Sequence, residues 1–569
     1  MTLAGSFEIA LTLALVLIAA YPLGAFMADV FENRRTFLTP VIGPVERGLY
    51  RMAGVDPEAE QEWFEYAISM VAFGGACMLS LYALLRLQAY LPLNPQGFPG
   101  VPPDLAFNIA VSFVTNTNWQ AYAGETTLSH FSQMVGLTTN NFLDSAAATA
   151  MAVALTRALA RRESPTIGNF WVDMTRTTLY VLVPLSIAVA LAFAALGVPQ
   201  TLSASVEATT LEGAKQVIAL GPVASQETIK LIGDNGGGFF NANSAHPFEN
   251  PNVWSNILQN WSQLVLPVAL VFAFGRMVGD WRQGRTLLAA MAVIFVTALL
   301  LIYLAESHGN PQLTAVGVDP SQGNMEGKDL RFGQGGAALF LDATTGTGTG
   351  ASNAVLESMT PIGGMVAMFN LLLGCISPGG VGTGLYSLLL LTLIAAFLGA
   401  LMIGRTPEYL GKKFGVREMQ FALFALLVSP VLLLGLSGAS TLLKTALDSL
   451  GAGGPHGLSE IVYAYASTAS DNGSAFAGLN ANTPWYNVTT GIVMFLGRFA
   501  HAIPILAIAG SLAAKKKVLA SPGTLPTDGA LFVVFLLGVI VIVTLLQYLP
   551  ALALGPIAEQ FLLQQGTLF

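Results

Sequence analysis

Charge is what this sequence has least of. Only 10% of its 569 residues are charged, whereas 53% are hydrophobic, and the mean hydropathy is +0.62. Soluble domains carry about 25% charged residues, so this chain lacks the polar surface that a water-soluble fold needs. Its apolar residues form runs such as 9–20, 287–304 and 531–546, and a helix of about 20 residues can cross a bilayer. The composition indicates an all-α polytopic membrane protein.

Cysteine and histidine are also scarce, which argues against a disulfide scaffold or a zinc site. Cys77 and Cys375 lie in separate apolar stretches, and the five histidines are scattered. His246 is a candidate metal ligand, although ordering of its own loop is the favoured interpretation. The chain also lacks a GxxxxGK[ST] phosphate loop and an Asp-Lys-Thr-Gly phosphorylation motif. We therefore expect no nucleotide on this chain and no catalytic site for ATP hydrolysis.

Ten membrane crossings are predicted, at 6–26, 64–88, 128–158, 172–196, 254–278, 286–305, 354–403, 418–444, 487–512 and 528–552. The seventh is too long for one straight helix. Its middle, 377–384 (SPGGVGTG), should break the helix because proline removes a hydrogen-bond donor and glycine is a poor helix former.

Basic residues give an independent test of this topology. They concentrate in alternate short loops, near Arg34, Arg157, Arg276, Lys412 and Lys515, and are few in the loops between. The positive-inside rule places the basic loops in the cytoplasm and the N-terminus outside.

Four of the outer loops contain a segment rich in Gly, Asn and Thr just before a crossing. They are 115–120 (TNTNWQ), 233–240 (GDNGGGFF), 345–351 (TGTGTGA) and 470–476 (SDNGSAF). Non-helical backbone at membrane depth is tolerated only where it lines an aqueous path or is buried in protein. Four such segments on one axis can replace the hydration shell of an ion with oxygen ligands, which suit a hard cation. The repetition predicts an ion filter.

Three charged residues accompany this predicted filter. Asp234 and Asp471 lie within its segments, and Arg498 lies well inside the ninth crossing. A carboxylate at membrane depth is a functional candidate, but each aspartate is equally well explained as a cap or as an acceptor of loop amides. For Arg498, pairing with a carboxylate and pairing with carbonyls of the broken seventh helix both stay open.

These elements divide the chain into six parts. Two extra transmembrane helices, one with its basic loop at 1–62 and one at 521–569, flank four helix–pore-loop–helix repeats. The repeats are predicted at 63–160, 161–280, 281–410 (whose second helix is broken at 377–384) and 411–520, in a pseudo-fourfold arrangement.

Longer stretches of the chain resemble the KdpA family, the potassium-translocating subunits of bacterial Kdp P-type ATPases, and through it the Trk/Ktr/HKT group. The resemblance covers nearly the whole chain. It is carried by 115–120, 235–251 (NGGGFFNANSAHPFENP), 379–386 (GGVGTGLY), 404–413 (GRTPEYLGKK) and 474–478 (SAFAG). The second and fourth of these stretches are far more specific than the filter glycines.

The resemblance implies a subunit that takes K⁺ from outside and passes it through an intramembrane tunnel to a KdpB-like P-type ATPase subunit. A KdpC-like subunit and a small single-span KdpF-like peptide would complete a complex in the bacterial inner membrane, and no nucleic acid partner is expected. The implied ion-binding residues are Asn116, Thr117, Asn118, Asp234, Asn235, Gly236, Gly348, Thr349, Gly350, Asp471, Asn472 and Gly473. Gln120 would tune affinity from the vestibule. Gly379, Gly380, Gly382 and Arg498 would obstruct the direct route to the cytoplasm.

The sequence departs from the family pattern at two places. Asp234 stands where relatives often have Thr, which would add a charge at the filter mouth, and Cys375 lies where relatives often carry a nearby Glu. The role of that acid in the tunnel is therefore not transferred to this chain.

Two other functions compete with a pump subunit. A free-standing Trk/HKT-like K⁺ or Na⁺ channel or symporter would need the filter but no partner. An intramembrane enzyme would need a catalytic constellation, and Asp144 in the third crossing has no evident Ser–His or paired-Asp partner.

Overall fold

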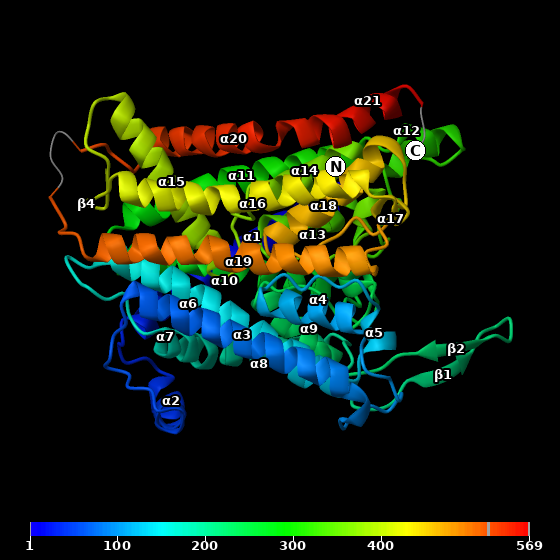
Figure 1. The fold of residues 1–569 in the computed structure, drawn as a ribbon. Helices are drawn as coiled ribbons and strands as arrows, with labels where there is room; N and C mark the ends of the chain where they lie inside the picture. Colours follow the sequence, from blue (N-terminus) through cyan, green and yellow to red (C-terminus); the bar gives the residue numbers. More distant parts are fainter. Residues whose placement is uncertain (1, 520–523, 567–569) are drawn as a thin grey trace.

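Long helices packed side by side make up the molecule (Figure 1). The computed structural model describes residues 2–519 and 524–566, and within them ten helical stretches are long and apolar enough to cross a membrane. The crossings contain α1 (Leu3–Phe31), α3 (Trp63–Leu87), α6 (Thr139–Ala160), α7 and α8 (Phe170–Arg176 and Val183–Ala195), α10 (Val253–Met277), α11 (Trp281–Ser307), α15 (Thr383–Met402), α16 (Val416–Leu442), α19 (Pro484–Ala513) and α20 (Ala530–Leu552). The prediction of an all-α, ten-crossing protein is confirmed.

Local sequence explains where several of these helices begin. Asn252 accepts hydrogen bonds from the amides of Trp254 and Ser255 at the start of α10, which satisfies donors that a helix end leaves unpaired. Pro484 stands in the first turn of α19, where its missing N–H costs nothing.

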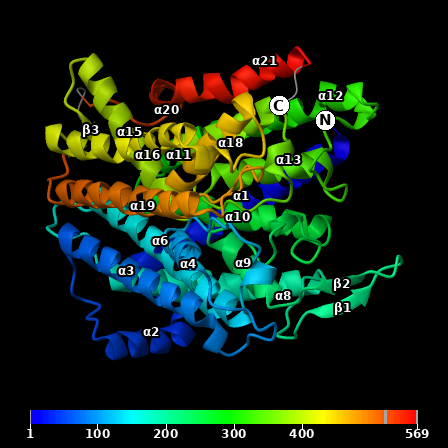
Figure 2. The ribbon, with the colours of Figure 1, turned by 45° about the vertical axis from the view of Figure 1, so that its right-hand side comes forward.

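Four short helices lie between crossings: α4 (Pro103–Val114), α9 (Val223–Ile232), α13 (Gly333–Gly346) and α18 (Gly454–Ala469). Their lengths of 10 to 16 residues are below the roughly 20 needed to span a bilayer. They gather in the half of the bundle nearer the chain termini (Figures 1 and 2). Each ends within or next to one of the Gly/Asn/Thr segments, so each segment reaches the interior of the protein.

The predicted break in the seventh crossing is present, but its bounds differ. The first part, α14 (Pro361–Leu372), ends before Gly374 and Cys375, whose φ angles are 82° and 51°. The second part, α15, starts at Thr383, directly after Gly382 at φ 92°. Left-handed backbone cannot continue a right-handed helix, so the break covers 373–382 rather than 377–384.

Smaller elements lie at the two ends of the bundle. At the end that carries the termini, β1 (Val206–Thr209) pairs antiparallel with β2 (Lys215–Ile218) in a projecting hairpin (Figure 1). At the opposite end, here called the basic face, lie α2 (Thr39–Ala53) and the pair β3 (Glu408–Tyr409) and β4 (Lys412–Lys413). The remaining short helices are α5 (Gly124–Thr127), α12 (Pro311–Ala315), α17 (Lys444–Leu447) and α21 (Ala558–Gln564).

Candidate functional site

The backbone of the four segments turns sharply through left-handed residues. Every segment contains at least one positive φ angle, as at Asn116 (66°), Asp234 (50°), Gly350 (73°) and Asp471 (55°). Only Gly, Asn and Asp adopt this conformation readily. The abundance of these residue types in the segments is therefore explained by their backbone geometry.

Side-chain amides join the first segment to the second. Asn116 donates to the carbonyl oxygen of Asp234 at 2.9 Å, and Asn118 donates to that of Asn235 at 2.6 Å. The amide of Asn235 donates in return to the side-chain oxygen of Asn116. These bonds hold two segments more than one hundred residues apart in sequence against each other.

Close backbone approach joins the second segment to the third and the third to the fourth. A Cβ on Gly236 would overlap the carbonyl oxygen of Thr349, and one on Gly350 would overlap that of Asn472. The amide of Asn472 also donates to the carbonyl oxygen of Thr347 at 3.0 Å. Glycine is required where two backbones come this near.

The fourth segment closes on the first. A Cβ on Gly473 would overlap the carbonyl oxygen of Thr117. A further contact joins the third segment to the fourth: a Cβ on Gly348 would lie 3.3 Å from the carbonyl oxygen of Asp471. Each segment thus contacts the next, and 115–120, 233–240, 345–351 and 470–476 form a closed ring, here called the filter ring. Its backbone carbonyls, threonine hydroxyls and carboxylates are the oxygen ligands that suit a hard cation.

Gln120 links the first two segments a few residues beyond the ring contacts. Its side-chain nitrogen donates to the carbonyl oxygen of Gly238 at 3.2 Å, and its side-chain oxygen accepts from the amide of Gly238 at 3.0 Å. The side chain is only partly buried, whereas Asn116 and Asn118 are almost fully buried. Gln120 therefore lies nearer solvent than Asn116 and Asn118 of the same segment.

The sequence suggested that Asp234 adds a charge at the filter mouth, and this stays a prediction. Its side chain is fully buried and accepts a hydrogen bond from the Thr349 hydroxyl at 2.9 Å. The bond ties the second segment to the third because the left-handed turn at Asp234 directs its side chain into the protein.

The broken segment 373–382 packs directly against the filter ring. The amides of Ser377 and Gly379 both donate to the carbonyl oxygen of Gly346 at 3.0 Å. Gly380 touches Gly348, and a Cβ on Gly382 would meet the backbone of Ala148 in α6. Gly379, Gly380 and Gly382 are thus adjacent to the third segment and α6.

Arg498 of α19 pairs with a carboxylate, one of the two options that the sequence left open. Its guanidinium lies 3.3 Å from Asp471 and 3.5 Å from the carbonyl oxygen of Asp144 in α6. The side chain is 5% exposed. One carboxylate oxygen of Asp471 has no hydrogen-bond partner among the described residues, and a buried acceptor of this kind is available to a cation.

Sequence reasoning missed the part that Asp144 plays. Its carboxylate accepts from the Asn235 amide at 2.9 Å, so this aspartate supports the second filter segment. A carboxylate inside an otherwise apolar crossing was the available signal, but only a catalytic role was considered for it.

Sequence reasoning also missed a buried ion cluster behind the second segment. Lys230 of α9 lies 2.8 Å from Glu227 and 2.6 Å from Glu249, and all three side chains are fully buried. Glu249 accepts from the amide of Phe240, while the carbonyl oxygen of Lys230 accepts from the amides of Asn235 and Gly236. The stretch 235–251 is thus folded around this cluster.

His246 has the loop-ordering contacts that the sequence favoured for it. Its ring stacks on Phe240 with centroids 3.7 Å apart and accepts from the amide of Phe248.

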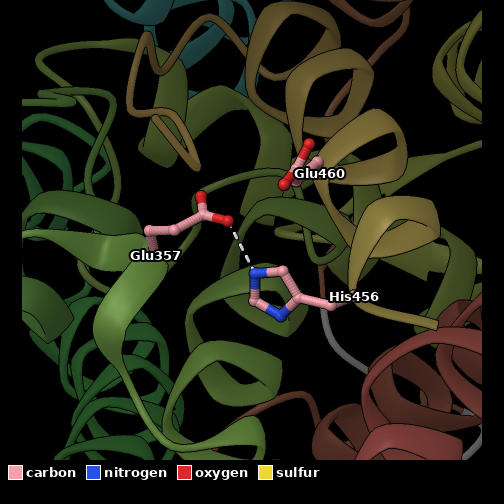
Figure 3. Close-up of side chains that lie close together, drawn as sticks. All are labelled: Glu357, His456 and Glu460. Carbon is pink, nitrogen blue, oxygen red and sulfur yellow. Dashed lines mark hydrogen bonds and ion pairs between the residues drawn. The ribbon is translucent and has the colours of Figure 1, made fainter. Parts of the chain in front are cut away.

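A second polar cluster surrounds His456 at the start of α18 (Figure 3). Its ring nitrogens lie 2.6 Å from Glu357 and 2.9 Å from Glu559, and ligand atoms of Glu357, His456 and Glu460 come within 4.8 Å of one another. This spacing suits a metal ion, but both ring nitrogens already face carboxylates, and Glu460 accepts the amides of Gly451 and Ala452. We therefore interpret the cluster as a clamp between the segment before α14, the start of α18, and α21.

The clamp predicts a pH-dependent contribution to stability. Burial lowers the pKa of His456, but its hydrogen bonds to Glu357 and Glu559 outweigh burial and raise the pKa from 6.5 to about 10. Because the pKa of His456 is higher in the folded than in the unfolded protein, the stabilisation is complete below about pH 6.5 and is lost as the pH rises through about 10.

We expect His456→Gln to lower the free energy of unfolding by about 1.5–3 kcal/mol at about pH 6 and by much less near pH 10. Thermal unfolding at several pH values, with the exposed His308→Gln as control, measures this; a pH-independent difference would contradict it.

The chain is similar to known proteins in sequence and in fold. The protein family described as "KdpA: Potassium-transporting ATPase A subunit" matches residues 10–561 of this chain. A protein of Allorhizobium ampelinum named "Potassium-transporting ATPase potassium-binding subunit" is 58% identical over 99% of both chains. One of the same name from Granulibacter bethesdensis is 54% identical over the full length of both. The potassium transporter TrkH from Vibrio parahaemolyticus superposes with a TM-score of 0.50 over 88% of this chain and 97% of its own, at 16% identity, and so shares the fold.

Proposed function

Because this chain belongs to the KdpA family of potassium-transporting ATPase A subunits, we propose that it binds extracellular K⁺ in the filter ring and delivers it to an ATP-driven partner. The observation that carries the proposal is the closed contact of four non-helical segments, from Asn116–Asp234 round to Gly473–Thr117. Their oxygens replace the hydration shell of a bare alkali cation.

Residues of all four segments contribute to the proposed ion site. They are Asn116, Thr117, Asn118, Asp234, Asn235, Gly236, Gly348, Thr349, Gly350, Asp471, Asn472 and Gly473. Backbone carbonyls are the main ligands, since several of the side chains are engaged with neighbouring segments. Gln120 acts from the vestibule by fixing the position of Gly238.

The direct route to the other side of the membrane is closed in this proposal. The break at 373–382, including Gly379, Gly380 and Gly382, lies against the third segment, and the Arg498 cation lies beside Asp471. The positive charge of Arg498 on this path repels K⁺. The ion therefore leaves sideways, through an intramembrane tunnel, to a KdpB-like P-type ATPase subunit.

This chain is then a non-catalytic subunit in the bacterial inner membrane, and ATP is hydrolysed by its partner. A KdpC-like subunit and a KdpF-like peptide complete the assembly. With the basic loops in the cytoplasm, the filter ring opens outside, on the face that carries both termini.

Ion flux through the purified complex in liposomes separates this function from that of a free-standing channel or symporter. We expect K⁺ to stimulate ATP hydrolysis and radioactive rubidium to cross only when ATP is supplied, because the direct route is closed. Brisk rubidium flux without ATP, with no K⁺ stimulation of hydrolysis, would instead identify a Trk-like channel.

A further inference from the structure

The helix α2 connects two crossings but does not run parallel to them. It is seen almost end-on in Figure 1, where the crossings are seen lengthwise, and more nearly side-on in Figure 2. Seven residues, 32–38, separate it from the end of α1, and seven extended residues reach at most about 25 Å. The helix is thus held close to the end of α1, across the direction of the crossings.

One face of α2 attaches it to the bundle. The carboxylate of Glu46 lies 2.8 Å from Arg176 and accepts hydrogen bonds from the hydroxyls of Tyr50 and Tyr180 at 3.0 and 2.8 Å. The buried Gly43 lies on the same face. These contacts fix the rotation of the helix about its own axis.

A second face of α2 carries exposed apolar side chains. Val41, Val45, Leu49 and Met52 recur every three or four residues and therefore share one side of the helix; they are 73%, 53%, 38% and 79% exposed. Phe37, two residues before the helix begins, is 78% exposed. Exposed apolar surface of this extent marks a site of contact with a membrane or a partner.

The opposite flank and the loop before the helix are basic. Arg47 and Arg51 lie one turn apart, and Arg35 precedes the helix; all three are exposed. Arg34 is paired with Asp29 and Glu32, but no salt bridge joins Arg35, Arg47 or Arg51 to a carboxylate in the described part of the chain. A helix with one apolar and one basic flank lies in the plane of a membrane surface.

A cavity of about 380 Å³ opens between α2 and its neighbours, beside these arginines. Four arginines line it, together with the glutamates Glu46 and Glu58; the arginines are Arg34, Arg35, Arg47 and Arg176. Since Glu46 is already bound to Arg176 and Arg34 is paired with acids, Arg35 and Arg47 are the guanidiniums available to an anion. Guanidinium groups bind phosphate through paired, charge-assisted hydrogen bonds.

We propose that α2 lies in the cytoplasmic leaflet and that this cavity binds the phosphate headgroup of an anionic phospholipid through Arg35 and Arg47. The apolar stripe then contacts the acyl chains of the same leaflet. The stripe favours a lipid over free phosphate, because phosphate alone leaves it exposed to water.

Lipid titration of the purified complex in detergent tests the headgroup site. Phosphatidylglycerol should raise its thermal transition temperature, whereas phosphatidylcholine with the same acyl chains and inorganic phosphate should not. Arg35→Gln/Arg47→Gln should weaken the apparent affinity for phosphatidylglycerol by roughly tenfold or more.

The control, Arg282→Gln/Arg285→Gln, removes two exposed arginines of the same basic face and should leave the affinity unchanged. Equal stabilisation by phosphatidylcholine or phosphate, or an unchanged affinity in the Arg35/Arg47 variant, would overturn the proposal.

Hydrogen–deuterium exchange of α2 in nanodiscs tests the membrane contact. Its amides should exchange more slowly in phosphatidylglycerol discs than in phosphatidylcholine discs, and Val41→Ser/Val45→Ser should remove the difference while the arginines stay in place. Protection that is independent of the lipid and is lost when the other subunits are stripped away would identify a protein partner instead and refute the lipid site. Neither outcome depends on which ion the filter ring binds.

Discussion

Replacing Gly350 with alanine should raise the K⁺ concentration for half-maximal ATPase stimulation by at least about tenfold, or about 1.4 kcal/mol. Gly350 has φ 73°, which costs an alanine about 1–2 kcal/mol, and the new Cβ would overlap the carbonyl oxygen of Asn472. Relieving that overlap moves an oxygen of the proposed ion site. The measurement is K⁺-dependent ATP hydrolysis by the purified complex.

Gly279 provides a matched control for this substitution. Its φ is 72°, and no atom lies within 4 Å of where its Cβ would be. Gly279→Ala therefore introduces the same backbone strain without disturbing the ring, and its K⁺ dependence should match that of the parent. Gly236→Ala, which meets Thr349, should behave like Gly350→Ala. If both ring variants keep the parent K⁺ dependence, the four segments are not the filter.

Lys230→Met should lower the free energy of unfolding by about 3–5 kcal/mol. The substitution keeps the length of the side chain but leaves Glu227 and Glu249 fully buried without their cation. Adding Glu227→Gln should restore part of the loss, since one buried charge is then removed. SDS-induced unfolding of the purified complex in mixed micelles measures these differences.

The exposed pair of Lys215 and Glu207 supplies the control. These side chains are 79% and 65% exposed on the β1–β2 hairpin, so Lys215→Met should change stability by less than about 1 kcal/mol. An equally small effect at Lys230 would mean that the buried cluster does not hold the second segment. A loss of K⁺ affinity together with the loss of stability would extend its role to the ion site.

The membrane architecture was predictable because lipid constrains sequence strongly. Runs of apolar residues and alternating basic loops located all ten crossings, and Pro378 with its neighbouring glycines located the break. The bounds of the break were less predictable, because Cys375 adopts a left-handed conformation that its residue type disfavours. The amide of Cys375 donates to the carbonyl oxygen of Asn370, and the amide of Ser377 donates to that of Gly346; the second contact, with a different segment, is not visible in the local sequence.

The four Gly/Asn/Thr segments could be located from their repeated composition, but their mutual contacts could not be predicted. Nothing in the spacing of Asn116 or Asn118 indicates that they donate to the backbone of the second segment. The supports behind the ring were missed for the same reason. Asp144 and Lys230 lie in helices, and only the folded chain shows that Asp144 accepts from the side chain of Asn235 and that the carbonyl oxygen of Lys230 accepts from the amides of Asn235 and Gly236.

The filter ring has one further property, which follows from its origin in a single polypeptide. Its four contacts are not all alike. Side-chain amides join the first segment to the second, a hydroxyl–carboxylate bond accompanies glycine against carbonyl between the second and third, and glycine against carbonyl closes the other two junctions. In a tetramer of identical chains, one substitution changes every quadrant together. Here a substitution alters one quadrant alone, so the affinity of the proposed ion site can be adjusted in small steps while three sides of the ring stay intact.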